Sequence, residues 1–166
     1  YGEVILDAAL EECAAFSYTT FSRKNYADFY ENDGGISRTH ETFNNHSHKW
    51  KQVQDIGVPG LSPREFVTKG VWKRVDENSI ICVFEPSVDS ENEVSGSPKS
   101  MTKRVVRGES WALVTFLKLP DIEGTPQTKM IWCTYINISS HLSSALVNQI
   151  IPHRLMYLER VRLLFD

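Results

Sequence analysis

The sequence has no apolar run long enough to cross a membrane, no large excess of charge of either sign, and only three cysteines among its 166 residues. A membrane-spanning helix needs about 20 consecutive apolar residues. Nucleic-acid recognition needs a basic face, whereas this chain carries 18 Lys and Arg against 21 Asp and Glu, a formal net charge of −3. These shortages argue against a membrane-spanning protein and predict no nucleic-acid partner.

The three cysteines, Cys13, Cys82 and Cys133, lie far apart and form no C-x-x-C pair. This pattern favours buried, reduced thiols over a disulfide framework. No basic segment followed by an apolar core opens the chain, so no secretory signal is expected. We therefore predict a cytoplasmic protein.

The composition is that of a folded domain, with 41% hydrophobic and 23% charged residues. The length suits a single domain over residues 1–166. A strand is expected at residues 3–6, followed by helices at 8–16 and 24–30. Residues 87–100 are almost entirely polar, which predicts a mobile surface loop within the domain. Further strands are expected at residues 46–53, 64–75, 79–85, 103–106, 111–117 and 128–138.

The strand and helix patterns together predict an α+β fold. In the strand at 64–75, Phe66 and Trp72 are predicted to face the core, and Val67 to face solvent with its charged neighbours. After residue 140 an apolar residue recurs every three or four positions, which predicts one long amphipathic helix to the C-terminus. Consecutive strands with short turns favour an antiparallel sheet. Because a curved sheet must cover its apolar concave face, we expect it to wrap around this final helix.

Three segments of the sequence resemble a known family. Residues 62–67 read SPREFV, residues 106–109 read VRGE, and residues 128–132 read TKMIW, followed by INI at 136–138 and by Leu142, Asn148 and Gln149. In this order and at this spacing they resemble the START domains, the lipid-transfer domains related to the steroidogenic acute regulatory protein. The resemblance covers most of the chain from residue 44 onward, and the opening strand and helix more loosely.

The resemblance implies a helix-grip fold with an internal apolar tunnel between the sheet and the C-terminal helix. The tunnel would hold one lipid or other apolar small molecule, and the protein would be a monomer that transports it during transient, peripheral contact with membrane surfaces. No catalytic residue, cofactor or metal is implied. Many START domains carry a further N-terminal helix and strands, which we do not expect here. Two alternatives stay open: a cavity-based enzyme of the polyketide cyclase-like helix-grip type, and a ligand-sensing regulatory domain of a larger protein.

The sequence departs from the steroidogenic START domains at two cavity positions. Those domains place a second arginine six residues after the position of Arg64, where this chain has Gly70. Lys51 stands where their acidic partner is expected. The charge pair that orients a sterol hydroxyl is therefore not predicted, and a sterol is disfavoured relative to other lipids.

Three histidines are candidates for a metal site. His46 and His48 alternate onto one strand face, with His40 nearby, but a metal site needs further ligands that the sequence does not clearly supply. Solvent-facing histidines are the favoured interpretation. Residues 73–78 and 139–144 are candidate gates of the tunnel.

Arg64 and Arg107 are candidates for contact with a ligand headgroup, since a charge in an apolar tunnel needs a partner. The alternative for Arg64 is that it pairs with a neighbouring carboxylate and braces the start of its strand. The predicted cavity-lining residues combine these arginines with apolar strand and helix positions. They are Arg64, Phe66, Trp72, Phe84, Arg107, Trp111, Leu113, Met130, Trp132, Thr134, Val147, Ile151, Leu155 and Leu158.

Overall fold

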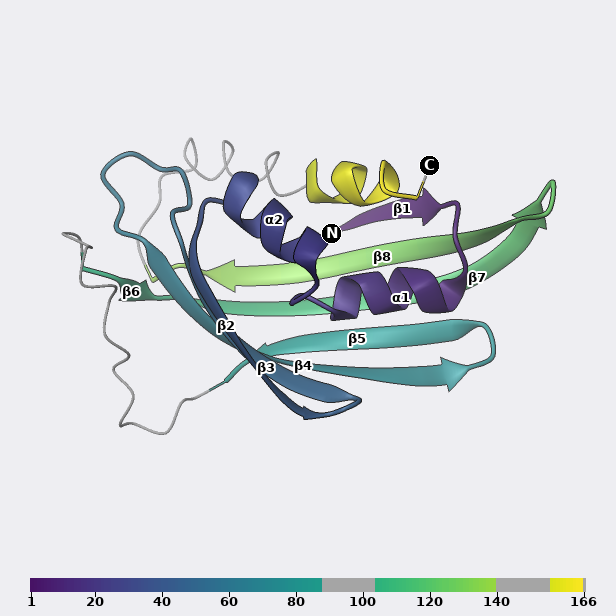
Figure 1. Cartoon of the computed structure of the whole chain (residues 1–166), viewed down its shortest axis with the longest axis horizontal. Coiled ribbons are helices and arrows are strands. Elements are labelled where there is room, and N and C mark those ends of the chain that lie inside the picture. The colour runs from purple at the N-terminus through teal and green to yellow at the C-terminus, as the bar shows by residue number, and fades with distance from the viewer. Residues whose placement is uncertain (88–103, 140–155, 166) are drawn as a thin grey trace.

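The computed structural model describes residues 1–87, 104–139 and 156–165. Strand β1 and two helices open the chain, and seven strands follow (Figure 1). The elements are β1 (Gly2–Leu6), α1 (Leu10–Tyr18), α2 (Arg23–Glu31), β2 (Gly35–Asn44), β3 (Ser47–Gln54), β4 (Arg64–Asp76), β5 (Ser79–Pro86), β6 (Val106–Arg107), β7 (Glu109–Ile122) and β8 (Thr125–Asn137).

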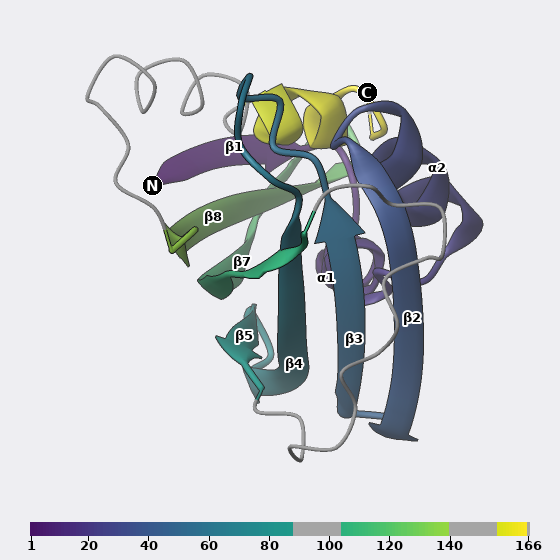
Figure 2. The same ribbon diagram turned by 90° about the vertical axis from the view of Figure 1, so that its left-hand side faces the viewer.

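One eight-stranded sheet contains all the strands of the described residues, in the order β1-β8-β7-β5-β4-β3-β2. Every neighbouring pair along this path is antiparallel, and the two-residue strand β6 pairs with β4 in parallel. The sheet curls so that β2–β4 face β7, β8 and β1 across an interior that holds α1 (Figure 2). The predicted α+β class and its curved, largely antiparallel sheet are confirmed.

The core lies where α1 packs on the inner face of β5, β7 and β8. Leu6, Cys13, Phe116 and Met130 have no exposed surface there. The turn between α2 and β2 is built by Gly34, whose positive φ of 68° suits glycine.

The two predicted N-terminal helices are confirmed by α1 and α2, each with bounds shifted by one or two residues.

Strand β2 was not predicted, because its ten residues are mostly polar and half-exposed. It pairs only with β3, at the edge of the sheet, so no face of it shows a clean apolar alternation. The prediction for Val67 was wrong: its side chain is 2% exposed. The strand expected at 103–106 is reduced, within the described residues, to β6 and begins at Val106.

The described part of the C-terminal segment is helical over residues 156–162 and lies beside α1 and α2 (Figure 1). Leu158 and Val161 are buried in the core. The rings of Phe165 and Phe16 pack edge to face, with their centroids 5.6 Å apart. The rest of the predicted long helix, and residues 88–100 of the predicted loop, lie outside the described residues. None of the described helices is long and apolar enough to span a bilayer.

Candidate functional site

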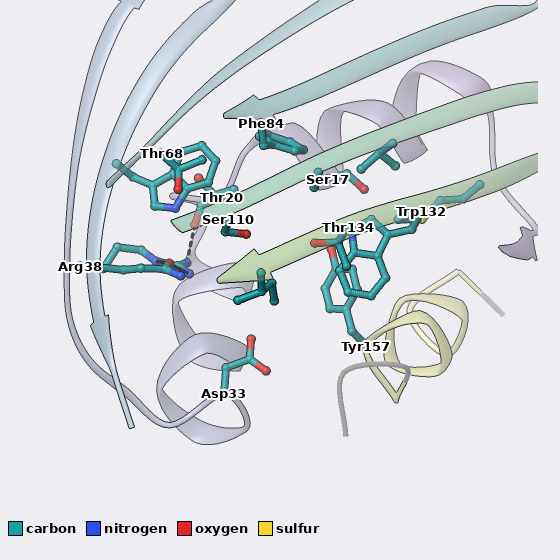
Figure 3. A pocket seen from close by; sticks show the side chains of 16 residues that line it. Ser17, Thr20, Asp33, Arg38, Thr68, Phe84, Ser110, Trp132, Thr134 and Tyr157 are labelled. Carbon is teal, nitrogen blue, oxygen red and sulfur yellow. Dashed lines mark hydrogen bonds between the residues drawn. The ribbon is translucent and has the colours of Figure 1, made fainter. Parts of the chain in front are cut away.

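A cavity of about 210 Å³ lies between the β2–β4 side of the sheet and the β7–β8 side (Figure 3). Its β7–β8 wall is largely apolar and its β2–β3 wall is polar. Tyr157 from the C-terminal helix and Ser17 from α1 complete the described lining. The apolar wall is formed by Ala112, Val114, Met130, Trp132 and Ile136, with Phe84 of β5 beside it. The polar wall is formed by Arg38, Gln52 and Thr68, with the Trp50 ring among them and with Thr20 and Asp33 beside it.

Space remains in front of the apolar wall because the inward positions of β7 carry small side chains. Ser110, Ala112 and Val114 point inward, and the residues between them point outward, as strand alternation requires. On β8 the inward residues Trp132 and Thr134 pair with Val114 and Ala112 across the ladder. The space in front of Ala112 is therefore left open for a ligand.

Four of the predicted lining residues line the cavity: Phe84, Met130, Trp132 and Thr134. Trp111 and Leu113 do not, because they occupy the outward positions of β7, where they are 38% and 44% exposed. Trp111 instead packs on Tyr135, its cross-strand partner, with ring centroids 5.3 Å apart. Val147, Ile151 and Leu155 lie outside the described residues.

The two predicted headgroup arginines both hold the start of β4 in place. Arg64 is buried, and its Nε donates to the Ile138 carbonyl at 2.6 Å while Nη1 donates to the Ser62 carbonyl. This ties β4 to the end of β8 through carbonyl oxygens. Arg107 is exposed and forms an ion pair with Glu65 at 3.1 Å. Neither arginine belongs to the described cavity lining.

The remaining predicted lining residues pack elsewhere. The Phe66 ring lies against the backbone of Gly108, where an added Cβ would come within 2.6 Å of it. Trp72 is half-buried, and its indole N–H donates to the Asn45 carbonyl at 2.8 Å. Leu158 belongs to the core cluster. The candidate gate at 73–78 contributes no side chain to the described lining, and Arg74 within it forms an ion pair with Glu11 of α1.

Arg38 is a cationic lining residue that the sequence did not predict, because it lies on the unpredicted strand β2. Its Nη1 donates to the Thr20 carbonyl at 3.0 Å, and its Nε and Nη2 donate to Gln52 Oε1 at 3.2 and 2.7 Å. The Phe29 ring lies 3.8 Å from the guanidinium carbon. Burial lowers the pKa of Arg38, but an arginine stays protonated in proteins. Nothing in its sequence neighbourhood marks it as a site residue.

The other ionisable lining residues are held neutral or paired. Asp33 accepts from Arg160 Nη2 at 2.9 Å, and Arg160 Nε also pairs with Asp28 at 3.0 Å. Burial raises the pKa of Tyr157 to about 12, so its hydroxyl stays protonated. Arg38 is therefore the cationic side chain of the described lining, and Asp33 is the anionic one.

The histidines form an aromatic cluster. His48 is 1% exposed and stacks on Tyr18 with ring centroids 4.2 Å apart, and the His40 ring is 5.3 Å away. Burial, and secondarily His40, lowers the pKa of His48 to about 4. The expected solvent exposure is correct for His46 and wrong for His48. In the described ranges no three His, Cys, Asp or Glu side chains are grouped to hold a metal ion.

The His48 ring also explains the glycine at position 70. A Cβ added to Gly70 would lie 2.6 Å from His48 Nε2 and 3.0 Å from the Trp50 ring. Real Cβ atoms do not approach other atoms so closely. The space beside Gly70 is therefore filled by two rings from β3.

Comparison with known proteins shows similarity at the level of structure. No family model matches the sequence, and no curated protein matches it. Human StAR-related lipid transfer protein 5 superposes with a TM-score of 0.67 at 15% identity, over 98% of this chain and 74% of that one. A STAR-related lipid transfer protein from Xanthomonas axonopodis gives 0.63 at 15% identity, over 96% and 81%. The human StarD13 (DLC2) lipid transfer and protein localization domain gives 0.61 at 15% identity, over 99% and 75%.

These superpositions define the class of fold. Nearly the whole chain is placed on the helix-grip fold of START domains, which confirms the resemblance given by the sequence motifs at the level of fold. Because the identities are 15%, function has to be argued from the cavity itself.

Proposed function

We propose that this protein binds one lipid or other hydrophobic small molecule in the cavity between its two sheet walls. The observation that carries the proposal is the apolar wall around Ala112, Trp132 and Ile136, which lines an open space next to the packed core residues Val114 and Met130. Protein interiors are otherwise close-packed. Each ligand methylene buried on such a wall contributes about 0.8 kcal/mol to affinity.

The size of the cavity favours a slender ligand. Pockets for drug-sized ligands span about 300–1,000 Å³, and the cavity here has about 210 Å³. A single acyl chain or a compact ring system fits this volume better than a phospholipid with two chains. The structural neighbours named as lipid transfer proteins support binding of a lipid-like molecule.

Binding without catalysis is the form of this function that the lining favours. General acid–base work needs a titratable group with a suitable pKa within reach of the ligand. Asp33 is the lone carboxylate of the described lining, and it is engaged by Arg160. The cyclase-like enzyme is therefore disfavoured. Transfer of the ligand between membranes, by a cytoplasmic monomer that contacts them transiently, is the finer part of the proposal.

The test is direct detection of the ligand. Native mass spectrometry of the purified protein is expected to show a single adduct per chain that disappears on denaturation, and solvent extraction should release an apolar compound in equal amount. A protein that is empty, and that also fails to take up a dansylated fatty acid, would contradict the proposal. Movement of the labelled lipid between donor and acceptor vesicles tests transfer separately.

A further inference from the structure

Arg38 faces the cavity with part of its hydrogen-bonding capacity unused. A guanidinium has five N–H donors, and three of them are engaged by Thr20 and Gln52. The other two N–H groups have no acceptor among the described residues. In Figure 3 the guanidinium extends from its strand toward Ser110 and the β7–β8 wall. These donors are therefore directed at the space that a ligand would occupy.

Arg38 also has no anionic partner among the described residues. Asp28 and Asp33 form their ion pairs with Arg160, and no ion pair among the described residues involves Arg38. Its hydrogen bonds go to amide and carbonyl oxygens, the face of Phe29 lies against the guanidinium, and the nearby Asp33 interacts with it electrostatically without forming an ion pair. A charge removed from water is costly unless it is paired. The cavity is therefore complementary to an anion at this point.

A second polar group lies beside the guanidinium without a partner. The Thr20 hydroxyl is buried, and no described residue hydrogen-bonds to it. Thr20 lines the cavity, and its own carbonyl accepts from Arg38. Asp33 accepts from Arg160 at 2.9 Å, and Arg160 is shared with Asp28. The donors that the polar wall offers to one small acidic group are therefore the two unused N–H groups of Arg38.

We propose that the ligand is an amphiphile with one anionic head group, a carboxylate or a phosphate, which pairs with Arg38 while its apolar chain packs on the inner face of β7 and β8. This inference rests on the proposed function. It names the chemical class of the ligand and assigns its head to the β2 side of the cavity. The chain then runs past Phe84 and Ala112 toward Trp132.

The test compares four ligands that share one chain: palmitic acid, hexadecanol, methyl palmitate and hexadecyl phosphate, each titrated into delipidated protein at neutral pH. A hydrogen bond to a charged group contributes about 1.5–3 kcal/mol, so the wild type should bind the two anionic ligands roughly 10- to 100-fold more tightly than the two neutral ones. Inorganic phosphate should compete poorly, because it lacks the chain.

Substitutions then locate the preference. Arg38→Gln should reduce the anionic preference to about one-fold and leave the affinity for hexadecanol nearly unchanged, whereas Arg38→Lys should retain part of the preference. The matched control is Arg107→Gln, which removes an exposed arginine outside the described lining. Should Arg38→Gln fail to fold, the ranking of the four ligands on the wild type still decides the matter.

Each failure has a distinct meaning. Equal affinity of the wild type for all four ligands would overturn the inference and leave the proposed function standing. Binding of inorganic phosphate as tight as that of hexadecyl phosphate would also overturn it, since the site would then recognise a free anion. Absence of binding by all four ligands would contradict the proposed function itself.

Discussion

The two faces of the β7–β8 pair differ in a way that a packed sheet does not. The outward face carries Trp111, Leu113 and Tyr135, exposed by 38%, 44% and 62%, and the inward face carries Ala112 and Thr134 at the same level of the ladder. Large apolar side chains normally face the interior. At the level of Ala112 and Thr134 this arrangement is reversed, and the small inward side chains leave a hollow beside them. Small inward side chains, more than apolar ones, mark the wall of a binding cavity.

The largest expected effect separates the two tryptophans of this pair. Trp132 lies on the inward face and packs on Tyr157 with ring centroids 5.4 Å apart, so Trp132→Ala should lower the free energy of unfolding by about 3–5 kcal/mol. Trp111→Ala removes an exposed cross-strand pair and should lower it by about 1 kcal/mol or less. Urea denaturation measures both. Equal losses would contradict the assignment of the faces.

Much of the fold follows from the sequence because long strands and amphipathic helices repeat their signal many times. The sequence did not predict which residues of β7 face inward, because both faces of the strand are apolar: Trp111 and Leu113 alternate with Ala112 and Val114. The preference for large side chains in the core then selected the wrong face for the first two residues. The buried Phe116 belongs to the same inward set as Val114, but only the structure reveals this.

The polar wall could not be predicted for a different reason. Arg38 lies in an edge strand where Ser, Thr, His and Glu alternate without an apolar face. Its role depends on contacts made by the fold, with Thr20 eighteen residues earlier and Gln52 fourteen residues later. Pairing of β2 with β3 and the position of α2 bring these groups together, and no local pattern encodes that.

The second expected effect extends the comparison of faces to β3. Outward-facing Lys49 and Lys51 form ion pairs with Glu41 and Glu65, whereas inward-facing His48 is surrounded by Tyr18, His40 and aromatic rings. Burial lowers the pKa of His48 to about 4 in the folded state, against about 6.5 when unfolded. The unfolded chain therefore binds the proton first as the pH falls.

The sign of the effect on stability follows from this difference. Between about pH 6.5 and pH 4 the unfolded state holds more protons, so the free energy of unfolding should fall as the pH falls, by up to roughly 3 kcal/mol from this residue. His48→Gln should flatten that part of the pH profile. His40→Gln serves as a comparison, because burial lowers the pKa of His40 too. An unchanged profile in His48→Gln would show that another group is responsible.

The third expected effect fills the hollow directly. Ala112→Trp places an indole in the space between Phe84 and Thr134, and should weaken ligand binding at least about 100-fold, equivalent to about 2.7 kcal/mol. Leu113→Trp, one residue along on the outward face, is the matched control and should change affinity less than about two-fold. Titration with a dansylated fatty acid measures both. Binding that survives Ala112→Trp would place the ligand outside this cavity.

The smallest perturbation uses the three thiols to check which way β8 faces. Cys13 and Cys82 have no exposed surface, and burial raises their pKa values to about 11 and about 12. Cys133 is exposed and lies between Trp132 and Thr134, on the outward face. Because the thiolate is the reactive form and needs access to the reagent, one thiol should react rapidly with Ellman's reagent in the native protein and all three after unfolding.

Cys133→Ser assigns that rapid reaction to the outward face. The variant should lose the native-state signal, keep the two slow thiols and bind ligand with unchanged affinity, since Cys133 lies outside the described lining. Saturation with ligand should leave the rapid reaction of the wild type unchanged. If the ligand instead protected the rapid thiol, Cys133 would face the cavity, the phase of β8 would be inverted, and Trp132 and Thr134 would have to lie outside.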